Sequence, residues 1–360
     1  MTGTFVIAEV GVNHDGSLAR AQELVEAAAE IGANAVKFQT FTAERLVNRT
    51  APKAEYQVGH SKGSTQFEML KHLELSTESH YVLGGLAADL GLEFISTPFD
   101  LESLAFLVND IGVKTIKISS GDLTNLPLLH TAGQTGLSVI MSTGMATMDE
   151  VELGIKALAH GRGMREGTQF DPPSLEAFSQ VSLRENSHPL PRNLTLLQCT
   201  SAYPAPAHEA NLLAMRTLAD SFGLPVGLSD HSLGIHLGIA AVTLGAQVVE
   251  KHLTLDTESE GPDHRASLDV REFEKLVDSI RAVERALGSG CKFPSREELE
   301  NAKLVRRGLY AARDLSPGDV VSESDIAILR PENGIPPSDY WMIVGATVTQ
   351  PIKLGQDLQV

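Results

Sequence analysis

The sequence predicts a closed parallel (β/α)₈ barrel, a TIM barrel, followed by a small β-rich domain. Three observations support this prediction. Short apolar segments alternate with longer helix-like segments, the alternation occurs eight times in about the length that such a barrel occupies, and the composition changes after Gly288. An open, doubly wound parallel sheet is the alternative, because it is built from the same repeating unit.

The predicted strands are short runs of apolar and β-branched residues, at 4–10, 35–40, 93–97, 114–118, 138–142, 194–199, 225–228 and 247–250. The predicted helices between and after them lie at 18–31, 78–90, 101–111, 126–134, 148–160, 212–222, 233–245 and 271–287. Strands that alternate with helices run parallel. Residues that follow the strands should therefore meet at one end of the barrel, where barrel enzymes have their active sites.

Two segments interrupt this alternation. Residues 42–76 predict a long loop with a short helix near 66–73, which would form a lid or a substrate wall. Residues 161–192 are polar and rich in proline, and they predict a tolerated surface insertion that contributes nothing to the core.

The predicted domain boundaries follow from the change in composition. The barrel is expected at 1–288, a linker at 289–302 and the second domain at 303–360. In this last part, short β-like runs are separated by turn sequences that contain proline and glycine. A domain of this size has a limited core, so packing against a barrel, its own or that of a partner, would supply further burial.

Composition and charge exclude several classes of function. The formal net charge of −17 opposes binding to nucleic acid and to anionic membranes. No signal peptide or membrane-spanning run is recognisable. The two cysteines, Cys199 and Cys291, lack the spacing of a zinc site or a disulfide framework, which favours a reducing compartment. We therefore expect a cytoplasmic protein.

Two histidines follow neighbouring predicted strands. His231 comes after the strand at 225–228 and His252 after the strand at 247–250, with one helix-like segment between them. Two neutral imidazoles on adjacent strand ends can hold a divalent transition metal and leave positions open for water and substrate. The pair therefore predicts a metal site.

Polar residues lie in or just after the C-terminal end of every predicted strand. They are Glu9, Asn13, His14, Lys37, Gln39, Thr97, Lys117, Ser119, Ser120, Asp122, Ser142, Thr143, residues 200–203, Ser229, Asp230, His231, Glu250, Lys251 and His252. Lysines combined with hydroxyl groups and backbone amides are suited to a phosphate group. No Walker loop or nicotinamide fingerprint is present. The predicted pocket therefore favours a phosphorylated substrate.

Several of these motifs, in this order, resemble the sialic acid synthase family. The motifs are Ala8-Glu9-Val10-Gly11-Val12-Asn13-His14, Val36-Lys37-Phe38-Gln39, Ser96-Thr97-Pro98-Phe99, Lys117-Ile118-Ser119-Ser120-Gly121, Ser142-Thr143-Gly144-Met145, Cys199-Thr200-Ser201-Ala202-Tyr203-Pro204, Ser229-Asp230-His231, Glu250-Lys251-His252 and Gly261-Pro262-Asp263-His264. The tail, with Arg330-Pro331 and Gly334-Ile335-Pro336, resembles the antifreeze-like (SAF) domain of that family. The segment 161–192 is longer than usual, and Pro331-Glu332-Asn333-Gly334 replaces a more familiar Pro-Gly-x-Gly.

The resemblance implies a metal-dependent condensation of phosphoenolpyruvate with an N-acylated hexosamine and the release of phosphate. N-acetylmannosamine would give N-acetylneuraminate. A 6-deoxy-diacetamido hexose would instead give legionaminic or pseudaminic acid. Ser201, Tyr203 and the loop at 42–76 are candidates for the contacts that decide between these sugars.

The resemblance also implies roles for individual residues. His231 and His252 would hold the metal, most commonly Mn²⁺, with Mg²⁺ or Co²⁺ as alternatives. The residues implied to bind phosphoenolpyruvate are Lys37, Thr97, Lys117, Ser120, Ser142 and Ser229. Those implied to bind the sugar are Gln39, Tyr203, Asp263 and Arg330, with Arg330 supplied by the other subunit of a domain-swapped homodimer.

Three carboxylates are candidates for the remaining chemistry. Glu9, Glu250 and Asp122 could stabilise the oxocarbenium centre that forms at C2, or accept the proton of the water that adds there. Each could instead orient a histidine or a lysine. Two other functions remain open from the residues: an aldolase or phosphosugar isomerase with a Schiff base on Lys37 or Lys117, and a sugar-binding protein without catalysis.

Overall fold

The computed structural model describes residues 3–54, 63–183 and 193–359. The chain divides into two compact units, Met1–Gly288 and Ser289–Val360.

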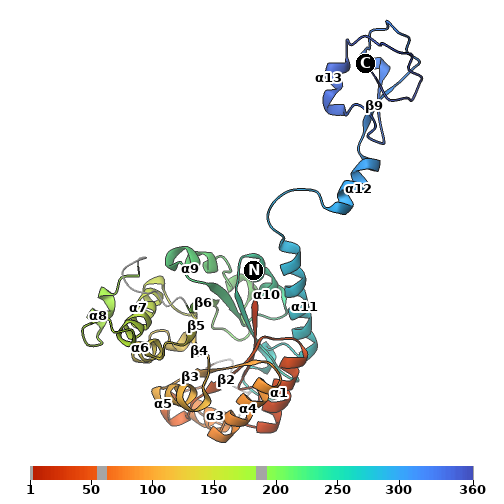
Figure 1. Cartoon of the computed structure of the whole chain (residues 1–360). Helices are drawn as coiled ribbons and strands as arrows, with labels where there is room; N and C mark the ends of the chain where they lie inside the picture. The colour runs from red at the N-terminus through yellow and green to blue at the C-terminus, as the bar shows by residue number, and fades with distance from the viewer. Residues whose placement is uncertain (1–2, 55–62, 184–192, 360) are drawn as a thin grey trace. The chain divides into compact units, whose positions relative to one another are not determined.

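The first unit is a closed barrel of eight parallel strands in sequence order. Figure 1 draws this unit with helices on the outside of the strands. The strands are β1 (Phe5–Gly11), β2 (Ala35–Thr40), β3 (Glu93–Pro98), β4 (Thr115–Ile118), β5 (Ser138–Ser142), β6 (Leu194–Cys199), β7 (Val226–Asp230) and β8 (Val248–His252). β1 pairs with both β2 and β8, and this closes the ring. The predicted TIM barrel is therefore confirmed, and the open sheet is excluded.

Helices surround the strands. In chain order they are α1 (Leu18–Glu30), α2 (Ala43–Leu46), α3 (Gln66–Leu73), α4 (Thr77–Asp89), α5 (Leu101–Phe106), α6 (Leu126–Thr135), α7 (Met148–Arg165), α8 (Leu175–Gln180), α9 (Ala214–Phe222), α10 (His236–Thr243) and α11 (Val270–Leu287). A π-helical turn at Leu107–Ile111 follows α5. Several helices begin at a local signal; α7, for example, has a capping box in which Thr147 and Glu150 satisfy each other's backbone N–H groups.

The interior of the barrel is built in layers. A buried apolar layer contains one residue from each of six strands: Ile7, Ala35, Ile95, Ile140, Leu197 and Val248. Side chains two residues apart on a strand point to the same face. The next inward layer toward the C-terminal strand ends therefore contains Glu9, Lys37, Thr97, Ser142, Cys199 and Glu250. The apolar layer supports a polar layer directly above it.

The expectation that residues 161–192 form an insertion without core contacts is partly wrong. Helix α7 continues through Gly161 to Arg165, and α8 buries Phe178 in the main core of the barrel. Gly161 does not end the helix, because it allows close packing against α6: a Cβ there would lie 1.9 Å from the carbonyl oxygen of His130. Residues 184–192 of the segment lie outside the described residues.

The loop after β2 contains the expected short helix. Helix α3 begins after Thr65, whose side chain accepts from the Glu68 N–H, and α2 precedes it. These helices share a small buried cluster with the ends of β1 and β2, formed by Val12, Phe41, Ala43, Met69, Leu70 and Leu73. The expected lid also includes residues 55–62, which lie outside the described residues.

The second unit begins with an exposed helix, α12 (Arg296–Val305), in which no residue is buried. A small antiparallel pair follows, β9 (Gly308–Ala311) with β10 (Ile326–Leu329), and then a short helix, α13 (Tyr340–Ile343). Its core is formed by Leu309, Ala311, Leu315, Val321, Ile343, Val348, Ile352 and Leu358. In the part of the chain that the structure describes, no helix is both long and apolar enough to cross a membrane.

Candidate active site

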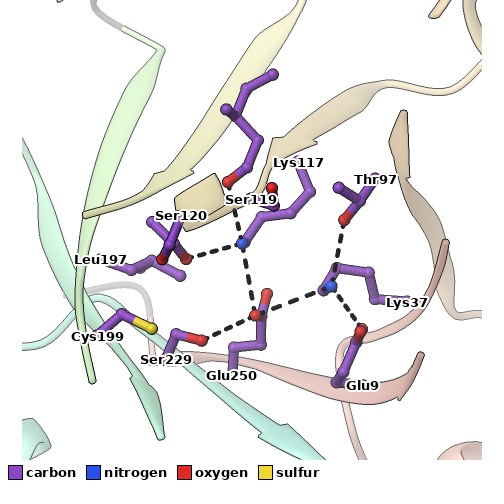
Figure 2. A network of polar contacts seen from close by, with 12 residues as sticks. Glu9, Lys37, Thr97, Lys117, Ser119, Ser120, Leu197, Cys199, Ser229 and Glu250 are labelled. Carbon is purple, nitrogen blue, oxygen red and sulfur yellow. Dashed lines mark hydrogen bonds and ion pairs between the residues drawn. The ribbon is translucent and has the colours of Figure 1, made fainter. Parts of the chain in front are cut away.

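The polar layer of the barrel contains a network of two lysines and two glutamates, shown in Figure 2. Lys37 on β2 forms an ion pair with Glu9 on β1, with 2.6 Å between Nζ and Oε2. Its ammonium also donates to the Thr97 hydroxyl at 3.3 Å and lies 3.9 Å from Glu250. Lys37, on β2, therefore contacts side chains from β1, β3 and β8.

Glu250 lies at the centre of this network. One of its oxygens, Oε1, is 3.5 Å from Lys117 Nζ and accepts from the Ser229 hydroxyl at 3.0 Å. Lys117 also donates to Ser142 at 2.8 Å. The other oxygen, Oε2, is buried and has no hydrogen-bond partner. The buried network thus retains acceptor capacity for a ligand or water.

Burial and neighbouring charges give the two glutamates different proton affinities. Burial, together with the nearby Glu250, raises the pKa of Glu9 to about 7 even though Lys37 opposes the shift. Burial also acts to raise the pKa of Glu250, but Lys117 and Lys37 outweigh it and lower the pKa overall. Glu9 can therefore exchange a proton near neutral pH, whereas Glu250 remains ionised.

The two predicted metal ligands lie close together beside this network. The ring centroids of His231 and His252 are 5.4 Å apart, and the ring of Tyr203 lies 4.2 Å from that of His231. The Nδ1–H of His231 donates to the Thr200 carbonyl at 2.9 Å, which leaves Nε2 as the lone-pair nitrogen. Nδ1 of His252 is buried without a hydrogen-bond partner.

These properties fit a metal site of two imidazoles. Burial, and then the neighbouring His231, hold the pKa of His252 well below its usual value, so its ring is in the neutral form that binds metals. Within the described ranges, no group of three or more histidine, cysteine or carboxylate side chains is arranged to hold a metal ion. A divalent ion held by these two imidazoles would take its other ligands from water or substrate.

The comparison with known proteins gives the family. The family model "NeuB family" matches residues 24–292, which is more than half of the chain, and the model "SAF domain" matches residues 306–358. The chain belongs to the NeuB family. It is therefore a phosphoenolpyruvate-condensing synthase, a transferase that makes a nonulosonic acid, with a C-terminal SAF domain. Enzymes of this family generally depend on a divalent metal and use phosphoenolpyruvate with an acylated hexose.

Three similar proteins have informative names. The chain is 48% identical to the N,N'-diacetyllegionaminic acid synthase of Legionella pneumophila, over 98% of this chain and 93% of the relative. It is 41% identical to the Campylobacter jejuni enzyme of the same name, over 98% of each chain. The solved structure of N-acetylneuraminic acid synthetase from Leptospira borgpetersenii is 31% identical, with a TM-score of 0.67 over 83% of this chain and 90% of that one.

The other predicted site residues of this NeuB-family chain differ in their contacts. Asp263 is buried, which raises its pKa to about 6, and its carboxylate lies 3.9 Å from Nδ1 of His252. Gln39 follows Lys37 on the same face of β2, and Ser120 accepts from the Gly144 N–H at 3.0 Å. Asp122 instead accepts from Ser119 and Asn125 within its own turn. The catalytic role expected for Asp122 stays a prediction.

Asp230 and Lys251 do not share the pocket with their neighbours. They alternate along β7 and β8 with Ser229, Glu250 and the two histidines, so they point away from the interior of the barrel. The expectation that every polar residue at a strand end faces one pocket is therefore wrong for these two. They form a buried ion pair with each other, with 2.8 Å between Nζ and Oδ2.

Cys199 was not predicted as a site residue. It ends β6 in the polar layer, and its sulfur lies 3.7 Å from Nδ1 of His231. Its position at the end of a strand is the signal in the sequence, whereas the spacing of the two cysteines indicates neither a disulfide nor a zinc site. Arg330 is exposed in the second unit, so its predicted contact with a sugar remains a proposal.

Proposed function

We propose that this NeuB-family enzyme is an N,N'-diacetyllegionaminic acid synthase. It would condense phosphoenolpyruvate with a 6-deoxy-diacetamido hexose and release phosphate. The observation that carries this proposal is the 48% and 41% identity to two enzymes of that name over nearly the whole chain. The identity to the sialic acid synthetase is only 31%. This difference favours the diacetamido sugar over N-acetylmannosamine, which the motifs alone had favoured.

The lysines would bind the phosphate and carboxylate of phosphoenolpyruvate. Lys37 and Lys117 are both buried, and hydroxyl groups of Thr97 and Ser142 are within hydrogen-bond distance of their ammonium groups. Ser229 and Ser120 supply further hydroxyls near the same strand ends. A buried anion needs paired cations and several short hydrogen bonds, and this layer supplies both.

His231 and His252 would hold the divalent ion, for which Mn²⁺ is the preferred candidate. When bound, the ion supplies Lewis acidity toward the aldehyde of the sugar. The neutral state of His252 and the tautomer of His231 support this assignment. Tyr203, Gln39 and Asp263 lie on the strand ends and loops around these histidines and would orient the sugar.

The glutamates would manage charge and protons after the carbon–carbon bond forms. C3 of phosphoenolpyruvate attacks the aldehyde carbon, C2 becomes an oxocarbenium centre, and water adds to C2 before phosphate leaves. Glu9 would accept the proton of that water, because its pKa is about 7. Glu250 remains ionised and would stabilise the cation.

The test is an assay of phosphate release with three sugars at equal concentration. The sugars are N-acetylmannosamine and the two 6-deoxy-diacetamido hexoses that lead to legionaminic and pseudaminic acid. We expect the highest kcat/KM with the legionaminic acid precursor, and no release when the sugar is omitted. A higher kcat/KM with N-acetylmannosamine would restore the sialic acid synthase assignment.

A further inference from the structure

The buried ion pair between Asp230 and Lys251 lies directly behind the two histidines. Lys251 is completely buried, and its ammonium donates to both the Asp230 carboxylate and the Ser232 carbonyl. The other oxygen of Asp230 accepts from the N–H and the hydroxyl of Ser232, at 2.9 and 2.6 Å. These contacts join the end of β7 and the residues just after it to β8.

The residues of this cluster are direct sequence neighbours of the two histidines. Asp230 immediately precedes His231, Ser232 immediately follows it, and Lys251 immediately precedes His252. The pair Asp230–Lys251 is also the last register pair between the two strands. His231 thus lies beyond the ladder. The ammonium of Lys251, the residue before His252, contacts the residues on either side of His231: the carboxylate of Asp230 and the backbone carbonyl of Ser232.

Overall stability does not explain why the barrel buries two charges at this position. An apolar pair of similar volume is often as stable as a buried ion pair or more so, because removing two charges from water is costly. An ion pair with four directed hydrogen bonds does, however, define one relative position of the two segments. A pair of apolar residues would define that position less well.

We propose that Asp230 and Lys251 are positioning residues, which fix the distance and orientation of His231 and His252 toward a divalent metal ion. This inference rests on the metal site of the proposed function. The imidazole of His231 is held on its other side by the Thr200 carbonyl, and its backbone carbonyl accepts from Ala205. The ion pair supplies the corresponding constraint toward β8.

The test compares Mn²⁺ binding with stability in variants of the full chain. The double variant Asp230→Asn/Lys251→Met removes both charges and changes volume little. Mn²⁺ affinity of the metal-free protein is measured by electron paramagnetic resonance titration, and stability by the midpoint of urea denaturation. We expect Mn²⁺ to bind about 10- to 100-fold more weakly, the range for residues that orient metal ligands. The urea midpoint should stay close to that of the wild type.

Two further variants complete the design. Ser232→Ala removes only the hydroxyl that donates to Asp230, and we expect about 2- to 10-fold weaker Mn²⁺ binding with a native circular dichroism spectrum. Arg281→Met is the matched control, because Arg281 bonds to Glu284 and to the Thr4 carbonyl before β1, at the opposite end of the barrel. It should leave Mn²⁺ affinity unchanged.

The outcomes separate this inference from the proposed function. If the wild-type protein binds Mn²⁺ and both the double variant and Ser232→Ala bind it equally well, the positioning role is wrong and the metal site stands. If the wild-type protein does not bind Mn²⁺, both fail. Weaker binding by the folded variants, with the Arg281→Met control unchanged, supports the inference.

Discussion

Glu250 offsets the repulsion between two buried lysine ammonium groups. Both ammonium groups lie within 4 Å of the same carboxylate oxygen, at 3.5 Å from Lys117 and 3.9 Å from Lys37. Burial lowers the pKa of Lys117, and Glu250 opposes that shift. An anionic substrate that enters this layer meets cations already held in place, at the cost of sharing them with two carboxylates.

Lys117 gives the first prediction at this scale. Lys117→Ala should raise the Michaelis constant for phosphoenolpyruvate about 10- to 100-fold, because a charge-assisted contact contributes about 1.5–3 kcal/mol. The Michaelis constant for the sugar should change much less. Lys114→Ala is the control: Lys114 is exposed just before the same strand and should have no effect. An unchanged value for phosphoenolpyruvate in Lys117→Ala would remove this lysine from the substrate site.

Glu9 gives a prediction for pH. Below pH 7 its carboxyl is protonated and leaves Lys37 available, whereas above pH 7 the ionised carboxylate competes with phosphoenolpyruvate for that lysine. Calorimetry therefore measures the dissociation constant of phosphoenolpyruvate at pH 6 and at pH 8. The ratio of the pH 8 value to the pH 6 value should be about tenfold larger in the wild type than in Glu9→Gln, because only the wild type loses the Glu9 proton over this range. The titration of phosphoenolpyruvate itself is common to both proteins.

A matched variant checks the assignment of this pH effect. Glu26→Gln removes an exposed carboxylate on α1 and should retain the wild-type pH dependence. If Glu9→Gln shows the same change with pH as the wild type, Glu9 does not compete for the lysine.

The histidine pair gives a prediction for metal removal. Prolonged dialysis against a chelator should abolish phosphate release, and Mn²⁺ should restore it, because His231 and His252 bring two imidazoles together at one site. His231→Ala, dialysed and supplied with Mn²⁺ in the same way, should remain inactive. Full activity in protein shown to be free of metal by elemental analysis would contradict this assignment.

At the scale of elements, two glycines allow α6 and α7 to pack closely against each other. Gly133 and Gly161 each face the backbone of the other helix, where a Cβ would lie 2.1 and 1.9 Å from a carbonyl oxygen. This contact brings the His130 and His160 rings to 5.1 Å, and Phe178 of α8 covers them. The short helix α8 therefore belongs to the core.

Phe178 provides a test of that conclusion. Phe178→Ala should lower the free energy of unfolding by about 3 kcal/mol, because a large ring that is only 4% exposed leaves a cavity. Leu175→Ala, on the same helix but 61% exposed, should change it by less than about 0.5 kcal/mol. Urea denaturation followed by circular dichroism measures both. Equal effects would return the segment to the status of a surface insertion.

The sequence predicted the strands and the polar layer because both depend on short-range patterns. The polar residues Glu9, Lys37 and Thr97 contrast with the apolar residues around them in otherwise buried strands. The outward direction of Asp230 and Lys251 differs from the expectation, because neighbouring residues on a strand point to opposite faces and only every second strand-end residue reaches the pocket. The length of α7 was missed because Gly161 resembles a helix end, and only the tertiary contact with α6 shows its role.

At the scale of the whole molecule, the second unit raises the question of what completes the site. We predict that Arg330 acts on the barrel of a partner subunit in a homodimer. Arg330→Ala and His231→Ala should each be inactive alone, and mixed dimers re-formed from both should regain activity, since one site then has an intact barrel and an intact arginine. Mixed dimers that remain inactive, when their formation is confirmed by differently tagged subunits, would contradict the exchange.

The closure of the ring by β1 and β8 has a consequence for how the protein is made. Glu9 and Glu250 lie on these two strands, which pair directly although they are synthesised at opposite ends of the barrel sequence. During translation, β1 therefore cannot form its hydrogen bonds to β8 until nearly the whole barrel has left the ribosome. A prematurely terminated chain cannot assemble the lysine–glutamate network, so only chains that are complete through β8 can consume phosphoenolpyruvate.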